Sequence, residues 1–208
     1  MRSIIHLITK LILMVLLLFI LSCAGTDSIE KVPIEPTRVT FATYQVAGPI
    51  RGNWQSEIKE EQESVKFTDS YTTIVPLGSG QKQIRVFKIP ISKEAQRMSK
   101  EMLASGFMDQ EHKILTEQFK GTGVSIVLKK FNQVTTISDK TVYYMSYEAH
   151  DTRARNVQEA ILYLYVPVDF GERQALYGFL YTDTHRADTL GKIALDSIDY
   201  VISNFQLK

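Results

Sequence analysis

Seven ionisable side chains that could do chemistry gather in two short stretches of the C-terminal half: His150, Asp151, Arg153 and Arg155, then Asp183, His185 and Arg186. Two imidazoles and two carboxylates could hold a divalent metal, whereas three guanidinium groups suit an anion or an acidic partner. A His/Asp pair could also serve a hydrolase as acid and base. The arginines would repel a cation, however, and a solvated loop rim held by ion pairs needs no ligand.

The two stretches can meet only if the strands that carry them are neighbours. Runs rich in apolar and aromatic residues predict strands over residues 141–149, 160–168 and 175–183, joined by short charged loops. Short connections are typical of antiparallel neighbours, because a parallel pair needs a long crossover. The loops after Ala149 and Thr182 should therefore lie at the same end of one sheet.

The remaining short motifs carry no recognisable catalytic pattern. Gly78-Ser79-Gly80 lacks the Gly-x-Ser-x-Gly pattern of a nucleophile elbow, and Gly121-Thr122-Gly123 lacks the following Lys-Ser/Thr of a phosphate loop. Both are predicted to be turns. No two histidines have metal-ligand spacing within one helix or turn. We therefore expect a protein that is not an enzyme and has no cofactor.

Cys23 is the single cysteine of the 208 residues, and it ends the apolar run of residues 11–21. Arg2 and Lys10 precede that run without any acidic residue, which is the pattern of a secretory signal. Ile20-Leu21-Ser22-Cys23 resembles the lipobox of bacterial lipoproteins. An uncleaved anchor, or a signal peptide cut elsewhere that leaves a free thiol, are the alternatives.

The lipobox resemblance implies a signal peptide over residues 1–22, diacylglycerol on the Cys23 thiol and acylation of the new amino terminus. Two or more acyl chains give stable membrane anchoring, which one chain alone does not. The residue after the cysteine is Ala24 rather than aspartate, which resembles the signal for transport to the outer membrane. The resemblance thus implies a protein on the periplasmic face of the outer membrane of a Gram-negative bacterium.

Charge and composition restrict the function and the domain organisation of the chain. It has 24 Lys and Arg against 23 Asp and Glu, a balance that does not support nucleic-acid binding. Residues 23–37 contain Pro33 and Pro36 without periodicity, and we expect a flexible tether there. Residues 38–208 have the size of a single domain.

The apolar pattern of residues 38–208 predicts strands and two helices. Further strands are expected over residues 39–46, 65–67, 71–77 and 83–89, with a turn or short helix around Trp54 and Ile58 and a strand end at Pro90. Helices are expected near residues 93–104, with Ser92 as cap and Gly106 as stop, and 187–204.

The strand faces predict the number of layers. Residues 161–166 are apolar on both faces of their strand, which indicates cover on both sides. The expected fold is therefore α+β, an antiparallel sheet covered by helices on both faces in a three-layer α/β/α sandwich.

This order of elements is similar to the PsbP-like fold of the extrinsic photosystem II protein and its bacterial relatives. The similarity rests on Gly52-Asn53-Trp54, on residues 65–69, on the mid-chain helix and on the closing segment over residues 198–207. It implies a non-enzymatic accessory that docks on a membrane complex, and it carries over no functional residue.

Together these observations predict a lipid-anchored periplasmic accessory that binds or assembles with envelope proteins. The alternative is a carrier of a lipid or small apolar ligand, held in an opening between sheet and helix. An envelope hydrolase that uses His150 or His185 with Asp151 or Asp183 is the third interpretation.

Overall fold

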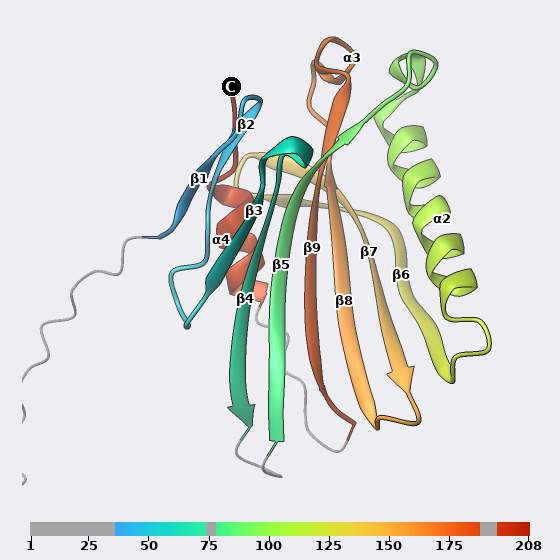
Figure 1. Ribbon diagram of the computed structural model, residues 1–208. Helices are drawn as coiled ribbons and strands as arrows, with labels where there is room; N and C mark the ends of the chain where they lie inside the picture. The colour runs from blue at the N-terminus through green and yellow to red at the C-terminus, as the bar shows by residue number, and fades with distance from the viewer. Residues whose placement is uncertain (1–35, 74–77, 188–194) are drawn as a thin grey trace, which may run out of the picture. The chain divides into compact units, whose positions relative to one another are not determined.

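The computed structural model describes residues 36–73, 78–187 and 195–208 (Figure 1). The predicted signal peptide, Cys23 and most of the predicted tether lie outside the described residues. Within them the chain forms two antiparallel sheets. The larger consists, in sheet order, of β3 (Gln55–Lys59), β4 (Ser64–Thr73), β5 (Gly78–Pro90), β9 (Ala175–Arg186), β8 (Asn156–Tyr165), β7 (Lys140–Asp151) and β6 (Val124–Ile137).

The smaller sheet joins the two ends of the described chain. It consists of β1 (Arg38–Thr40), β2 (Tyr44–Ala47) and the C-terminal β10 (Gln206–Leu207), in the order β1-β2-β10. Three short helical turns and two longer helices complete the described structure: η1 (Glu60–Gln62), η2 (Ala95–Arg97), α2 (Lys100–Gln118), α3 (Phe170–Arg173) and α4 (Leu195–Ser203).

Side chains on the two faces of the large sheet enter separate hydrophobic clusters, because successive residues of a strand point to opposite faces. In β8, Ile161 and Tyr163 pack with α4 and the small sheet, around buried residues such as Phe205. Leu162 and Leu164 pack on the other face with residues of α2. The large sheet is therefore buried on both sides along its central strands.

The predicted three-layer α/β/α sandwich with helices on both faces, including its PsbP-like form, is wrong. Strands make up 51% of the structure and helices only 24%. Residues 38–47 fold as a hairpin and recruit β10, so a second sheet shares one face with the short α4. On the other face α2 contacts β6 and β7 near one edge. Among the described residues, one face is thus covered by a second sheet together with α4, and α2 covers the other face only near one edge, so helices do not form a full layer on either face.

The first predicted helix is displaced toward the C-terminus. Residues 95–97 form only a 3-10 turn, and α2 begins after Ser99, whose hydroxyl accepts the Met102 backbone N–H at 3.2 Å. The helix then continues through Gly106, where a Cβ would meet open space. Glycine weakens a helix but does not end it when enough neighbouring residues favour the helix, so the predicted stop is wrong.

The second predicted helix, near residues 187–204, is seen over Leu195–Ser203, and residues 188–194 lie outside the described residues. Ile198, Val201 and Ile202 form the apolar stripe of α4 and are all buried. Phe205 is also buried and lies just beyond the helix.

The predicted strands 141–149, 160–168 and 175–183 correspond to β7, β8 and β9, which pair consecutively as an antiparallel meander. The turn at residues 121–123 and the strand end at Pro90 are also confirmed. Four local predictions were wrong. The expected turn at Gly78-Ser79-Gly80 is the start of β5, and the expected turn or short helix around Ile58 is the strand β3. The single strand expected over residues 39–46 divides between β1 and β2, and the separate strands expected at residues 65–67 and from residue 71 onward belong to one strand, β4.

Candidate functional site

The structure brings the two predicted stretches of ionisable residues to the same end of the large sheet. Asp151 at the end of β7 pairs with Asn156 at the start of β8, and Asn156 pairs with Arg186 at the end of β9. The alternation of the strands then separates the seven side chains. His150, Asp183 and His185 lie on the face of the sheet that α4 and the small sheet also cover.

Of the other predicted residues, Asp151 ends β7, Arg153 and Arg155 lie in the turn between β7 and β8, and Arg186 ends β9. The Asp151 carboxylate accepts the backbone N–H groups of Arg153 and Ala154 at 2.9 and 3.0 Å, so it stabilises the turn. The Arg153 side chain lies against Gly123, and Arg155 has a left-handed backbone with φ of 54°. Asp151 is therefore not placed as the acid–base partner of His150, which is one of the pairs that the hydrolase interpretation offers.

A cluster of carboxylates surrounds the two histidines, and two of these carboxylates were not predicted from the sequence. Glu148 on β7, Glu159 on β8 and Asp183 on β9 are cross-strand partners in one row. His150 Nε2 and Lys129 Nζ both lie 3.0 Å from Glu148 Oε2. We call Glu148, His150, Glu159, Asp183 and His185 the histidine–carboxylate cluster. The alternation of the strand was the signal that could have found Glu148, two residues before His150.

Burial shapes the electrostatics of this cluster. Asp183 is fully buried, and His185, with 5% of its side chain exposed, has its Nδ1 3.9 Å from Asp183 Oδ1. Burial raises the pKa of the Glu159 carboxyl, the charges of Asp183 and Glu148 raise it further, and His185 and Lys129 oppose the shift. Across the described part of the chain, no three His, Cys, Asp or Glu residues are arranged to hold a metal ion.

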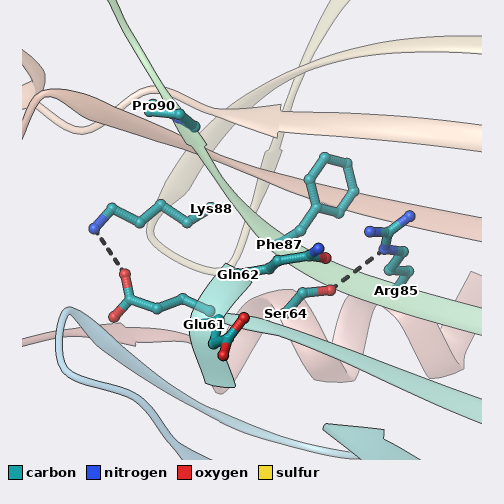
Figure 2. A pocket seen from close by; sticks show the side chains of 8 residues that line it. Glu61, Gln62, Ser64, Arg85, Phe87, Lys88 and Pro90 are labelled. Atoms are coloured by element: carbon teal, nitrogen blue, oxygen red, sulfur yellow. Dashed lines mark hydrogen bonds and ion pairs between the residues drawn. The ribbon is translucent and has the colours of Figure 1, made fainter. Parts of the chain in front are cut away.

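A second candidate site lies on β4, β5 and η1. A cavity of about 450 Å³ opens there, which we call the β4–β5 pocket (Figure 2). Such a volume is within the usual range for sites that bind small molecules. Its lining consists of Glu61, Gln62, Glu63, Ser64, Arg85, Phe87, Lys88 and Pro90.

Arg85 is the exposed cation of this pocket. Its Nε donates a hydrogen bond to Ser64 Oγ at 3.3 Å, and its guanidinium carbon lies 5.2 Å from the centre of the Phe87 ring. Within the described ranges no carboxylate lies within 4.0 Å of the guanidinium nitrogens. The Nη groups of Arg85 are therefore available to a ligand.

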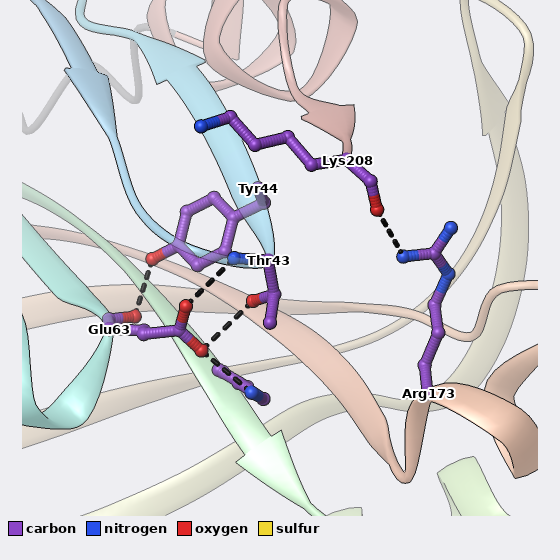
Figure 3. Close-up of polar contacts among 6 residues, drawn as sticks. Thr43, Tyr44, Glu63, Arg173 and Lys208 are labelled. Atoms are coloured by element: carbon purple, nitrogen blue, oxygen red, sulfur yellow. Dashed lines mark hydrogen bonds and ion pairs between the residues drawn. The ribbon is translucent and has the colours of Figure 1, made fainter.

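Glu63 fixes the opposite wall of the pocket (Figure 3). Its carboxylate accepts the backbone N–H and the hydroxyl of Thr43, both at 2.9 Å, and pairs with Lys88 Nζ at 2.7 Å. Its carbonyl oxygen accepts the Tyr44 hydroxyl. Burial acts to raise the pKa of the Glu63 carboxyl, but the hydrogen bonds and charge of Lys88 and the Thr43 donors hold it below its usual value.

These contacts explain how Glu63 keeps an unusual backbone. Its φ of 41° is left-handed, which is uncommon for a residue with a side chain. Polar contacts from β2 and β5 hold it there, so the wall formed by η1 is fixed before any ligand arrives. Sequence patterns did not single out Arg85 or Glu63, because only the pairing of β4 with β5 brings them together.

The predicted opening between sheet and helix does not coincide with this pocket. Leu103, Ala104 and Met108 of α2 are buried against the sheet, as are Ile198 and Val201 of α4. The β4–β5 pocket lies instead over strands that α2 does not cover. The alternative interpretation as a carrier with a ligand between sheet and helix therefore gains no support from these contacts.

Comparison with known proteins gives little further guidance. No protein-family model matches the chain, and no curated protein matches it. Among solved structures, LpqN, described as involved in cell envelope biogenesis of Mycobacterium tuberculosis, is similar over 88% of this chain and 96% of LpqN, with 8% sequence identity and a TM-score of 0.43. That likeness is too distant to transfer a role, so a functional proposal has to rest on this chain's own residues.

Proposed function

We propose that this chain is a lipid-anchored accessory of the bacterial cell envelope that binds an envelope partner through its folded unit. The sequence supports the anchor, because the lone Cys23 ends an apolar run that comes after a basic start. Residues Glu35–Lys208 form one compact unit, which fits a tethered domain. Within the described residues no helix is long and apolar enough to cross a membrane. The periplasmic face of a Gram-negative outer membrane is the proposed location.

The observation that supports binding best is the β4–β5 pocket. It is concave, its walls are held by hydrogen bonds, and Arg85 in its lining is exposed. An arginine held in this way is suited to recognising a carboxylate or phosphate on a partner, because little side-chain freedom remains to be lost on binding. We therefore place the partner-binding surface at this pocket.

The anchor is tested by Cys23→Ser, with Ser22→Ala as the matched control because alanine is also small. Cells are labelled with a fatty acid analogue and then fractionated. We expect the wild-type and Ser22→Ala chains to be labelled and to sediment with membranes, and the Cys23→Ser chain to be unlabelled. A Cys23→Ser chain that is still processed and still sediments with membranes would show that Cys23 is not the anchor.

The partner-binding surface is tested by photo-crosslinking in cells. A photoreactive residue replaces Gln62 at the pocket rim or, as control, Glu117 on the exposed face of α2. We expect a discrete crosslinked species from position 62 that is lost when Arg85→Gln is added, and none from position 117. Equal crosslinking from the two positions, or a product that ignores Arg85, would rule out the pocket as the surface.

A further inference from the structure

We propose that the β4–β5 pocket binds an oxyanion, a phosphate or a carboxylate, that is attached to an apolar group. Arg85 is the anion-binding residue, and Phe87 is the apolar floor. This inference names the ligand chemistry of the surface described under the proposed function and therefore rests on that function.

Arg85 is oriented to receive an oxyanion. The hydrogen bond from Nε to Ser64 Oγ and the contact with the Phe87 ring hold the guanidinium plane from two directions. Among the side chains drawn in Figure 2, no hydrogen bond or ion pair reaches the two Nη groups. Two parallel N–H donors match the spacing of two oxygens on one phosphate or carboxylate, which gives a stronger bond than a single neutral donor.

The remaining charges of the pocket favour a ligand with a single oxyanion group. Lys88 is already paired with Glu63 at 2.7 Å, and Glu63 is also held by Thr43. Among the residues described, Arg85 is thus the cation of the lining with no carboxylate within 4.0 Å, and Glu57 acts on it only at longer range. The carboxylate of Glu61 belongs to the same lining and would repel a polyanion. A ligand with one oxyanion group can pair with Arg85 alone, whereas a ligand with several such groups would also bring negative charge close to the Glu61 carboxylate.

The floor of the pocket supplies an apolar surface for the rest of the ligand. The Phe87 ring is half-buried and lies over Gly178, where a Cβ would come within 2.5 Å of the ring. Pro90 extends the apolar lining at the end of β5. A cavity of about 450 Å³ with one fixed aromatic ring has room for an apolar group next to the anion.

The test measures binding to the purified full-length Cys23→Ser chain, which lacks the proposed acyl anchor. The chain is kept in a mild detergent because it retains the apolar run of residues 11–21. The probes are phenyl phosphate, benzoate, inorganic phosphate and benzyl alcohol, and their binding is measured by calorimetry. We expect phenyl phosphate and benzoate to bind, and inorganic phosphate and benzyl alcohol to bind at least several-fold more weakly. Equal affinity for benzyl alcohol and benzoate would overturn the role of the anion.

Variants then assign the binding to Arg85. Arg85→Gln should weaken phenyl phosphate binding about 10- to 100-fold, because a charged hydrogen-bond pair is lost. Arg85→Lys keeps the charge without the fork and should recover only part of the affinity. Arg153→Gln, an arginine of the β7–β8 turn, is the matched control and should bind as wild type. Arg85 is exposed, and thermal melting checks that each variant is folded. Unchanged affinity in folded Arg85→Gln would overturn the assignment.

A vesicle experiment shows whether the anion belongs to a lipid headgroup, and a comparison with the crosslinking result separates the proposed ligand from the proposed function. Vesicles of phosphatidylglycerol, compared with phosphatidylcholine, should bind in an Arg85-dependent way if the anion is a lipid headgroup. Binding of benzoate and phenyl phosphate without vesicle binding assigns it to a soluble or protein-borne group. If position 62 crosslinks to a partner but none of the anions binds, the proposed ligand chemistry is overturned and the proposed partner-binding surface is retained. If phenyl phosphate binds but position 62 gives no crosslink, the proposed partner is overturned and the ligand chemistry is retained.

Discussion

Gly178 lies directly opposite Phe87 on the neighbouring strand, and the Phe87 ring occupies the space that a side chain at position 178 would need. A Cβ added there would lie 2.5 Å from Cζ of the ring, well inside contact distance. The missing side chain on β9 therefore allows an aromatic ring on β5 to lie against the sheet. The same ring supports the Arg85 guanidinium, so Gly178 is linked to the β4–β5 pocket through one side chain.

We expect Gly178→Ala to destabilise the protein by about 1–3 kcal/mol, because the ring must leave its position or the strands must separate. The matched control is Gly106→Ala on α2, where a Cβ would meet open space and alanine favours the helix by about 0.5–1 kcal/mol. Urea unfolding of the two variants and wild type measures both changes. Stability equal to wild type in Gly178→Ala would mean that Phe87 is not held as described.

The lowered pKa of the Glu63 carboxyl predicts that the stability of the protein depends on pH. Its carboxyl pKa in the folded protein is below the ordinary value of 4.5, so the folded state binds fewer protons than the unfolded state in that range. The stabilisation is complete above about pH 4.5 and is lost as the pH falls through the folded pKa. Glu63→Gln should therefore cost about 1–3 kcal/mol at pH 7, where Lys88 and Thr43 lose a charged acceptor.

The measurement is the difference in unfolding free energy between wild type and Glu63→Gln at pH 7 and at about pH 3.5. We expect the difference to shrink at the lower pH, because Glu63 is then increasingly protonated in wild type as well. Glu61→Gln, on the exposed neighbouring carboxylate, serves as the control and should change stability by less than about 0.5 kcal/mol. A constant penalty at both pH values would contradict the charge-based account.

Local patterns predicted the meander of β7, β8 and β9 well, because each strand is long, both of its faces are apolar and its loops are short. They failed where distant parts of the chain decide the structure. The sequence predicts one strand over residues 39–46, yet residues 38–47 fold into a hairpin that pairs with residues 206–207. No local pattern shows that pairing. Because the pairing creates a second sheet, the predicted three-layer sandwich is wrong.

The candidate sites show the same limit. His150, Asp183 and His185 could be placed near one another from strand order alone, but Glu159 could not be added without the register of β8 between its neighbours. Arg85 and Ser64 are 21 residues apart and meet only through the pairing of β4 with β5. A site built from one residue on each of several strands leaves no motif in the sequence.

Phe205 is the aromatic centre of the cluster beneath α4. Its ring centre lies 5.0 Å from that of Tyr177 and 5.1 Å from those of Tyr44 and Phe179. We expect Phe205→Ala to cost about 3–5 kcal/mol, because it leaves a cavity among rings that cannot all close on it. Chemical denaturation measures the loss, and Ile114→Ala on the exposed side of α2 should stay within about 0.5 kcal/mol of wild type. A small loss at position 205 would mean that this core is loosely packed.

Ser99 marks the true beginning of α2, and its substitution separates the observed helix start from the predicted one. Ser99→Ala removes the acceptor of the Met102 backbone N–H and should cost about 1 kcal/mol. Ser105→Ala lies inside the helix, where alanine is favoured, and should be neutral or slightly stabilising. Thermal or urea unfolding distinguishes the two. If Ser99→Ala is as stable as wild type, this hydrogen bond does not stabilise the helix start.

Glu159 should respond to pH in the direction opposite to Glu63. Burial, with the nearby charges of Asp183 and Glu148, raises its pKa in the folded protein above the ordinary 4.5, so the folded state binds more protons than the unfolded state. The stabilisation from its protonated form is complete below pH 4.5 and is lost as the pH rises through the folded pKa.

Glu159→Gln, which stays neutral, should therefore be more stable than wild type at pH 7.5, by less than about 1 kcal/mol because the group is partly solvated. At pH 4 the two should unfold at nearly the same urea concentration. Glu117→Gln on the exposed face of α2 controls for a general effect of removing negative charge. Loss of stability in Glu159→Gln at pH 7.5 would instead mean that the ionised carboxylate is stabilised by His185 and Lys129 more than it is penalised by burial.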